Sequence, residues 1–136
     1  MLWCDGGSRG NPGPAAVGYV LEDERGRLLE EFGEQIGVAT ATEAECRALI
    51  AGLKRVVALG LSRLEVRLDA EVIAAHVRGE QTVDSYRARR LLAEVKELAA
   101  SVDAVSFRWI PRAENGRANA LVWLALTENN RGQVTP

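Results

Sequence analysis

Three acidic residues occupy positions from which their carboxylates could meet. Asp5 follows a short apolar run at the N-terminus, and Asp69 follows a run whose residues alternate in the manner of a strand. Glu45 lies in the first turn of a helix with an apolar stripe. If the two strands are parallel neighbours, all three acids reach one edge of the sheet, which is where α/β sheets bind ligands.

Crowded carboxylates repel one another, and the usual resolutions are a shared proton or a bound cation. Oxygen ligands with no His or Cys beside them favour Mg²⁺ or Mn²⁺. Two such ions could activate a water molecule and stabilise the leaving oxygen of a phosphodiester, with no covalent protein nucleophile. Each acid taken singly could also be a helix cap, a turn residue or a solvated charge, and spacing alone leaves that alternative open.

The glycine-rich run over residues 5–14 predicts a long structured loop. It lacks the Gly-Lys-Ser/Thr ending of a phosphate-binding loop, and its glycines do not match the dinucleotide fingerprint. Its backbone could still approach a polyanion closely, with Ser8, Arg9 and Asn11 as side-chain donors. An ordinary turn is the alternative interpretation.

The hydrophobic periodicity predicts the elements that must position these residues. We expect strands over 2–4, 15–21, 26–37, 64–68 and 104–110, and helices from Thr42 to a stop at Gly60 and over 72–77, 86–102 and about 118–127. Thr42 and Glu45 have the spacing of a capping box. The order predicts an α/β fold, whose mixed sheet joins an N-terminal antiparallel hairpin to parallel strands linked by helices.

The composition is that of a globular protein, with 136 residues of which 47% are apolar and 26% charged. We expect one domain over 1–136, a poorly ordered tail from about residue 128, no membrane span and a cytoplasmic location. Cys4 and Cys46 lack zinc-site spacing and are expected to be buried, reduced thiols.

The net charge of −2 and a pI near 5.5 argue against binding to nucleic acid by bulk electrostatics. The charge is unevenly distributed, because residues 1–83 carry a net −4 and residues 84–136 a net +2. Any basic surface should therefore come from Arg87, Arg89, Arg90, Arg108, Arg112 and Arg117. A solvated helix face is the alternative for the first three.

Three segments resemble the ribonuclease H family, type 1, in the form that lacks a basic protrusion. They are Asp5-Gly6-Gly7-Ser8-Arg9-Gly10-Asn11-Pro12-Gly13-Pro14, Thr42-Glu43-Ala44-Glu45-Cys46-Arg47-Ala48-Leu49-Ile50, and Trp109-Ile110-Pro111-Arg112 followed by Glu114-Asn115 and Ala118-Asn119-Ala120-Leu121. The similarity extends from residue 2 to about residue 127. It implies a ribonuclease H-like fold with a five-stranded mixed sheet.

The resemblance implies an endonuclease that cuts the RNA strand of an RNA:DNA hybrid and leaves a 5′-phosphate. We expect the protein to be a monomer. The family holds two Mg²⁺ ions, or Mn²⁺ as a substitute, on four carboxylates. Asp5, Glu45 and Asp69 match three of them. The fourth position falls on Asn119, which keeps a carbonyl oxygen but loses the negative charge, so we expect weakened metal binding and Asn119 as a weak catalytic and metal-ligating member.

The resemblance also implies nucleic-acid contacts, which fall on Gly6, Ser8, Arg9, Asn11, Thr40, Thr42, Glu71 and Arg112. Asn11 and Thr40 match the family's pocket for a DNA phosphate. Ala41 and Thr42 replace two asparagines, Ala70 replaces a serine, and Glu71 would face nucleic acid with the wrong sign. The flexible-loop histidine of the family has no counterpart, and His76 is expected to be a helix-surface residue.

Two other functions remain open at this point. The chain could be a binding module with the same fold that grips hybrids or structured RNA but cuts them weakly or not at all, since Ala41, Thr42, Ala70 and Asn119 depart from the family's pattern. It could instead be a nuclease acting on double-stranded RNA. Three intact carboxylates argue against a pure binding module, because crowded acids beside a phosphate would only weaken binding. No protein partner is implied.

Overall fold

The computed structural model describes the backbone of residues 1–134 and the side chains of residues 1–127. The strands are β1 (Leu2–Ser8), β2 (Gly13–Glu22), β3 (Leu28–Ala39), β4 (Arg63–Leu68) and β5 (Ala104–Trp109). The helices are α1 (Ala41–Ala58), α2 (Glu71–Val77), α3 (Tyr86–Ala100) and α4 (Gly116–Val134), and a 3₁₀ turn (Arg112–Asn115) precedes α4.

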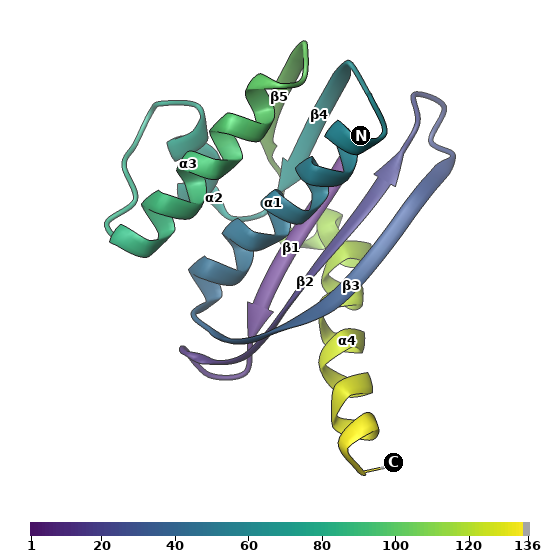
Figure 1. Ribbon diagram of the computed structural model, residues 1–136, viewed down its shortest axis with the longest axis vertical. Coiled ribbons are helices and arrows are strands. Elements are labelled where there is room, and N and C mark those ends of the chain that lie inside the picture. Colours follow the sequence, from purple (N-terminus) through teal and green to yellow (C-terminus); the bar gives the residue numbers. More distant parts are fainter. Residues whose placement is uncertain (135–136) are drawn as a thin grey trace.

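The five strands form one mixed sheet in the order β3-β2-β1-β4-β5. β2 pairs antiparallel with both β1 and β3, whereas β4 pairs parallel with both β1 and β5. Helices α1 and α3 lie side by side over one face, and α4 packs on β1, β2 and β3 from the other face (Figure 1). The α/β fold with a hairpin followed by parallel strands is therefore confirmed.

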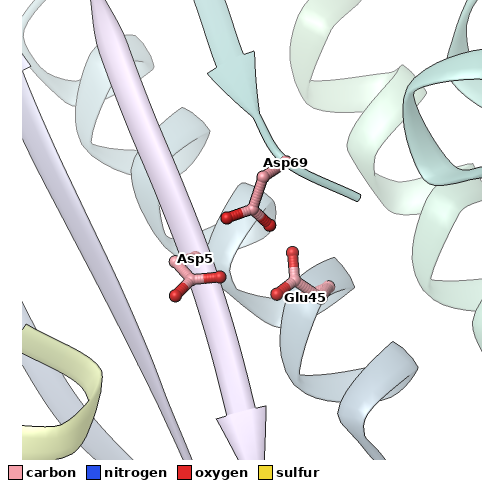
Figure 2. A group of neighbouring side chains, drawn as sticks. All are labelled: Asp5, Glu45 and Asp69. Carbon is pink, nitrogen blue, oxygen red and sulfur yellow. The ribbon is translucent and has the colours of Figure 1, made fainter. Parts of the chain in front are cut away.

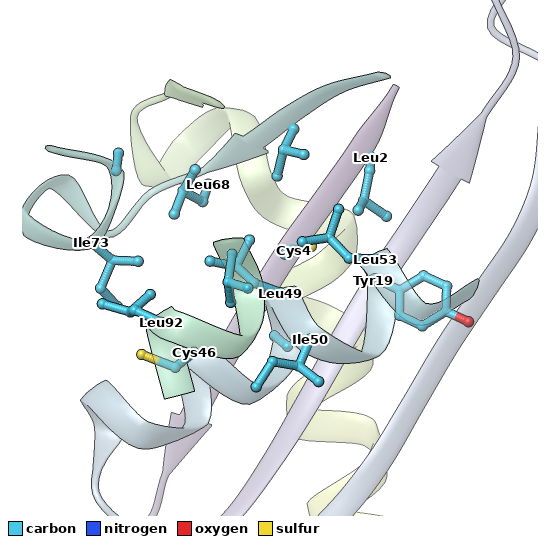
Figure 3. Packing of buried hydrophobic residues seen from close by; sticks show 14 of the residues in the cluster. Leu2, Cys4, Tyr19, Cys46, Leu49, Ile50, Leu53, Leu68, Ile73 and Leu92 are labelled. Carbon is cyan, nitrogen blue, oxygen red and sulfur yellow. The ribbon is translucent and has the colours of Figure 1, made fainter. Parts of the chain in front are cut away.

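The main hydrophobic core lies between the sheet and α1 with α3. The stripe of α1 expected from the sequence, with Leu49, Leu53 and Val56, is fully buried there, and Leu92 of α3 packs into the same cluster (Figure 3). Burying one such side chain stabilises the fold by about 1.5–3 kcal/mol. This packing fixes α1 against β1, which in turn fixes the position of every residue in the first turn of α1.

Both cysteines, Cys4 and Cys46, are buried and free, as expected. Burial raises the pKa of both thiols, with Glu45 adding to the effect by its negative charge. The helix expected over 118–127 is longer and runs from Gly116 to Val134. The side chains from residue 128 onward lie outside the described part of the structure, so the poorly ordered tail expected there stays a prediction.

Within the residues that the structure describes, no helix is long and apolar enough to cross a membrane. The cytoplasmic location expected from the sequence stays a prediction.

Candidate metal centre and the groove around it

Asp5 lies inside β1, which corrects the expectation that the strand ends at Cys4. The glycine-rich run continues the strand to Ser8 because it pairs with β2, with Asp5 opposite Gly18. Opposite residues in a ladder share a face, so Asp5 points to the side of the sheet that α4 covers. A Cβ on Gly18 would stand 2.7 Å from the Ala118 carbonyl oxygen, and this bare backbone is what lets α4 come close to Asp5.

Glu45 reaches the site because it is not part of the cap of α1. The expected capping box of Thr42 and Glu45 is wrong: Thr40 is the N-cap, its hydroxyl accepts from the Glu43 N–H at 3.1 Å, and Glu43 closes the box. The N-cap therefore lies two residues before the expected one, and the helix begins at Ala41. Glu45 therefore lies on the second turn with a carboxylate that the cap does not use.

Gly6 allows α1 to touch β1 beside Glu45. A Cβ at Gly6 would stand 2.2 Å from the carbonyl carbon and oxygen of Ala44, a distance that no side chain can accept. In this contact the Gly6 N–H donates to Glu45 Oε1 at 3.1 Å. The carboxylate is thus oriented by the strand that carries Asp5.

Asp69 follows β4 directly, as expected. β1 and β4 are parallel, and their pairing ends with Cys4 opposite Leu68. The next residues, Asp5 and Asp69, therefore lie side by side. Asn115 supports this junction: its Nδ2 donates to the Cys4 carbonyl oxygen at 2.8 Å and, more weakly, to Asp69 Oδ2 at 3.4 Å. The Trp109 Nε1 donates to the Asp69 carbonyl oxygen at 3.3 Å.

The three acids converge where β4 ends beside the middle of β1 (Figure 2). Asp5, Glu45 and Asp69 each offer a carboxylate oxygen, and these oxygens lie within 4.8 Å of one another. Burial raises the pKa of Glu45 well above its ordinary value, and the neighbouring Asp5 adds to this. Burial and the charge of Asp5 also raise the pKa of Asp69, although Asn115 and Arg112 oppose the shift. The expected convergence is confirmed.

The site fits a divalent cation. Asp5 is 1% exposed, and its Oδ1 has no hydrogen-bond partner in the described part of the chain. The basic group nearest to the acids among the recorded ion pairs is Arg112, whose Nε is 4.0 Å from Asp69 Oδ2 and whose side chain is 77% exposed. A buried, unpartnered carboxylate oxygen among three acids is costly without a cation or a proton, and hard oxygen ligands suit Mg²⁺ or Mn²⁺.

Asn119 occupies the side of the site formed by α4. Its Nδ2 donates to Asp5 Oδ2 at 2.8 Å, so the amide nitrogen rather than the carbonyl oxygen faces the acids. A half rotation of the amide would present Oδ1 to an ion instead. In the observed orientation Asn119 takes one lone pair of Asp5 that a metal could use.

A groove of about 690 Å³ opens over the acids. Its lining includes five of the residues expected to contact nucleic acid, namely Gly6, Ser8, Thr42, Glu71 and Arg112. Arg9, Asn11 and Thr40 lie outside this lining. The Asn11 Oδ1 accepts from the Ala41 N–H at 3.0 Å, so Asn11 joins the loop before β2 to the residue that follows the N-cap Thr40. The two residues expected to hold a DNA phosphate are thus neighbours.

The expected basic surface does not form one patch around the groove. Arg117 pairs with Glu22 and Glu31, and Arg89 donates to backbone carbonyls at the start of α3. Arg112 is the one member of the expected set that lines the groove. His76 is partly buried rather than a plain surface residue, because its Nδ1 accepts from the Val83 N–H at 3.1 Å.

Sequence patterns did not single out three residues that the structure places at the site. Asn115 is 1% exposed and Trp109 holds the backbone of Asp69, while Trp123 of α4 lines the groove. Asn115 and Trp109 stand in the C-terminal motif, whose resemblance to the family was their only signal. Trp123 had none, because an aromatic residue on an apolar helix is usually a core residue.

Comparison with known proteins places this site in a wider group. A family model described as reverse transcriptase-like matches residues 3–125. Ribonuclease HI of Halobacterium salinarum is 40% identical over 126 residues, which are 93% of this chain and 63% of that protein. A bifunctional protein of Mycobacterium tuberculosis is 37% identical over 122 residues, 89% of this chain and 34% of that protein. The chain thus spans less than two thirds of the length of these relatives.

Solved structures agree. The crystal structure of RNase H1 from Halobacterium salinarum superposes with a TM-score of 0.91 at 39% identity and covers 93% of this chain and 96% of that chain. LC11-RNase H1, crystallised in complex with an RNA/DNA hybrid, superposes with a TM-score of 0.88 at 34% identity and covers 94% of this chain and 96% of that one.

Proposed function

Because the chain belongs to the ribonuclease H family, type 1, we propose that it is a metal-dependent endonuclease that hydrolyses the RNA strand of RNA:DNA hybrids. The observation that carries the proposal is the convergence of Asp5, Glu45 and Asp69, whose oxygens lie within 4.8 Å of one another. The relative crystallised with an RNA/DNA hybrid, similar over 94% of this chain, supports the choice of substrate.

In this proposal Asp5, Glu45 and Asp69 hold two Mg²⁺ ions, or Mn²⁺ in their place. Divalent ions held there would supply an activated water and neutralise charge on the phosphate and on the leaving oxygen. Asp5, whose buried Oδ1 has no hydrogen-bond partner among the described residues, would be one of the ligands. Gly6 and Asn115 keep the acids in register by their hydrogen bonds to Glu45 and Asp69.

The substrate would be recognised mainly by shape and by the 2′-hydroxyls of its RNA strand. The lining residues Gly6, Ser8 and Thr42 would contact the RNA strand. Asn11 and Thr40, which join the glycine-rich loop to the start of α1, would hold a phosphate of the DNA strand, with Arg9 nearby on the exposed loop. Arg112 supplies positive charge at the groove, whereas Glu71 lowers it.

We also propose that the protein acts as a monomer with one domain, since all three acids come from this chain. The hydrogen bond from Asn119 to Asp5 favours a second candidate, a binding module of the same fold that holds hybrids but cuts weakly. A preference for double-stranded RNA is a third outcome of the same test.

A cleavage assay with matched duplexes tests the proposal. Labelled RNA:DNA hybrid, RNA duplex and DNA duplex of one sequence would each be incubated with Mg²⁺, Mn²⁺ or EDTA. We expect metal-dependent cuts in the RNA strand of the hybrid, with 5′-phosphate ends, and none in the DNA duplex. Hybrid binding without any cleavage would establish the binding module instead, and cleavage of RNA duplex alone would change the substrate.

A further inference from the structure

Trp123 stands at the edge of the groove without a role in the core. It lines the same groove as Glu45 and Asp69, and 41% of its surface is exposed. The apolar stripe of α4 is formed by other residues, Val122, Ala125 and Leu126, which pack against Ala16 of β2. The position of Trp123 therefore needs an explanation other than packing.

The geometry of α4 aims Trp123 toward the groove. Asn119 donates to Asp5, and Trp123 comes four residues later, so both side chains lie on one face of the helix, one turn of about 5.4 Å apart. A Cβ built on Gly7 would stand 3.7 Å from Trp123 Cζ2, which places the ring beside the backbone of β1 two residues after Asp5. The indole is thus a neighbour of the site on its α4 side.

The other two tryptophans have partners inside the protein. The guanidinium of Arg67 lies 5.1 Å from the ring centroid of Trp3, and Trp109 donates to the Asp69 carbonyl oxygen. Among the hydrogen bonds of the described residues, none uses the Nε1 of Trp123. Its N–H and much of its ring are available to a molecule in the groove.

We propose that Trp123 is a substrate-contacting residue that packs its indole against the sugar of the RNA nucleotide next to the scissile phosphate. This inference rests on the function proposed above. In a duplex the bases are paired and stacked, so sugars and phosphates are what the minor groove offers to a side chain. A flat apolar ring with one donor suits a ribose, whose carbon face is apolar and whose 2′-hydroxyl can accept the N–H.

The contact compensates for missing charge. Asn119 is neutral, Glu71 is acidic, and Arg112 is the one basic side chain among the groove's lining residues. Binding energy for the substrate must then come from contacts other than phosphate pairing, and an aromatic ring that packs on a nucleotide is one such contact. Trp123 is the one aromatic residue in the described lining of the groove.

Direct binding and steady-state kinetics test this role together. Binding of labelled hybrid would be measured by fluorescence anisotropy in an Asp5→Asn background with Mg²⁺, so that the result needs no cleavage. In that background Trp123→Ala should weaken binding about tenfold, which is toward the lower end of the loss caused by removing an aromatic ring that stacks on a base. In the otherwise native chain the same change should raise KM by about tenfold and alter kcat by less than about threefold, since it removes ground-state binding.

Two further variants separate contact from structure. Trp123→Phe keeps a ring and should retain most of the affinity, whereas Trp123→Gln keeps helix propensity without the ring and should behave as Trp123→Ala does. Leu124→Ala is the matched control: Leu124 is the next residue of α4, is 50% exposed and lies outside the groove lining. Its affinity and KM should equal those of the unchanged chain, with thermal melts confirming that each variant folds.

Unchanged binding in Trp123→Ala and Trp123→Gln, or an equal loss in Leu124→Ala, would overturn the proposed contact. If the native chain cuts no duplex, the proposed nuclease fails. The anisotropy comparison would still decide whether Trp123 contacts the hybrid.

Discussion

The two sides of the candidate metal centre differ in charge and in how they are held. The sheet and α1 supply three acids, Asp5, Glu45 and Asp69, whose oxygens converge within 4.8 Å. The α4 side supplies a neutral amide, Asn119, and an exposed indole, Trp123. The acidic side has the oxygen ligands of a cation site, whereas the α4 side has groups suited to hydrogen bonding and to packing on a nucleotide.

In the proposed function, the acidic side decides whether the site can bind a metal ion at all, and the α4 side changes only how strongly it binds. The acids are fixed by the ladder between β1 and β4 and by the contact of Gly6 with α1, so they stay together whatever α4 provides. A fourth negative charge on α4 would add attraction for a cation but is not needed to assemble the other three. Changes on the acidic side should therefore have larger effects than changes on the α4 side.

The largest effect is expected from Asp5→Asn. It removes the buried charge at the centre of the acidic side, so we expect cleavage of hybrid to fall by at least about 10³-fold, the scale of losing a principal electrostatic group. Initial rates with Mg²⁺ give the result, and anisotropy with the same hybrid checks that binding persists. A rate within about tenfold of the native chain would mean that Asp5 is not a metal ligand.

A large loss of stability is expected from Gly6→Ala. Its new methyl group would stand 2.2 Å from the Ala44 backbone and push α1 from β1, at the upper end of the roughly 1–3 kcal/mol that overpacking costs. Thermal unfolding should show a Tm lower by roughly 10 °C. Gly7→Ala is the control, because its Cβ would meet nothing nearer than 3.4 Å and should change Tm by less than about 3 °C. Equal melting of the two variants would contradict the close approach.

A gain is expected on the α4 side from Asn119→Asp. It replaces the amide that donates to Asp5 by a fourth carboxylate, so the Mg²⁺ concentration for half-maximal cleavage should fall by about tenfold, equal to roughly 1.4 kcal/mol. A magnesium titration of hybrid cleavage measures this. Asn119→Ala, which removes the donor without adding charge, shows how much of the change comes from freeing Asp5. An unaltered magnesium requirement would show that position 119 does not influence metal binding.

The smallest effect concerns stability against pH. The pKa of Glu45 and that of Asp69 lie above their ordinary values of 4.5 and 3.8, so these groups stabilise the metal-free fold most below those values. Their contribution is lost as pH rises toward the folded pKa values. Bound Mg²⁺ should offset that loss, raising Tm by about 3 °C more at pH 7 than at pH 5. NaCl of equal ionic strength is the control, and an equal shift at both pH values would contradict the assignment.

The sequence predicted the fold well where a local pattern carries the information. Alternation identified β4 and the 3.6-residue period identified α1, and both end near the expected residues. The three acids could be found because each lies within or directly after such an element. The family resemblance raised them from a hypothesis to a specific set.

Two of the errors came from long-range contacts and one from a neighbouring local cap. The run after Cys4 was read as a loop because it is rich in glycine, yet pairing with β2 makes it strand. Thr42 and Glu45 have capping spacing, but Thr40 takes the cap and leaves Glu45 for the site. Trp123 could not be found from periodicity, because its place beside Gly7 depends on how α4 crosses the sheet.

Calorimetric titration of the metal-free chain with Mn²⁺ tests the central claim most directly. The Oδ1 of Asp5 has no hydrogen-bond partner among the described residues, and the pKa values of Glu45 and Asp69 are raised. The chain should therefore bind Mn²⁺ and release protons as it does so. Asp5→Asn should abolish this binding. Absence of Mn²⁺ binding to the native chain, or equal binding by Asp5→Asn, would show that these acids are not a metal centre.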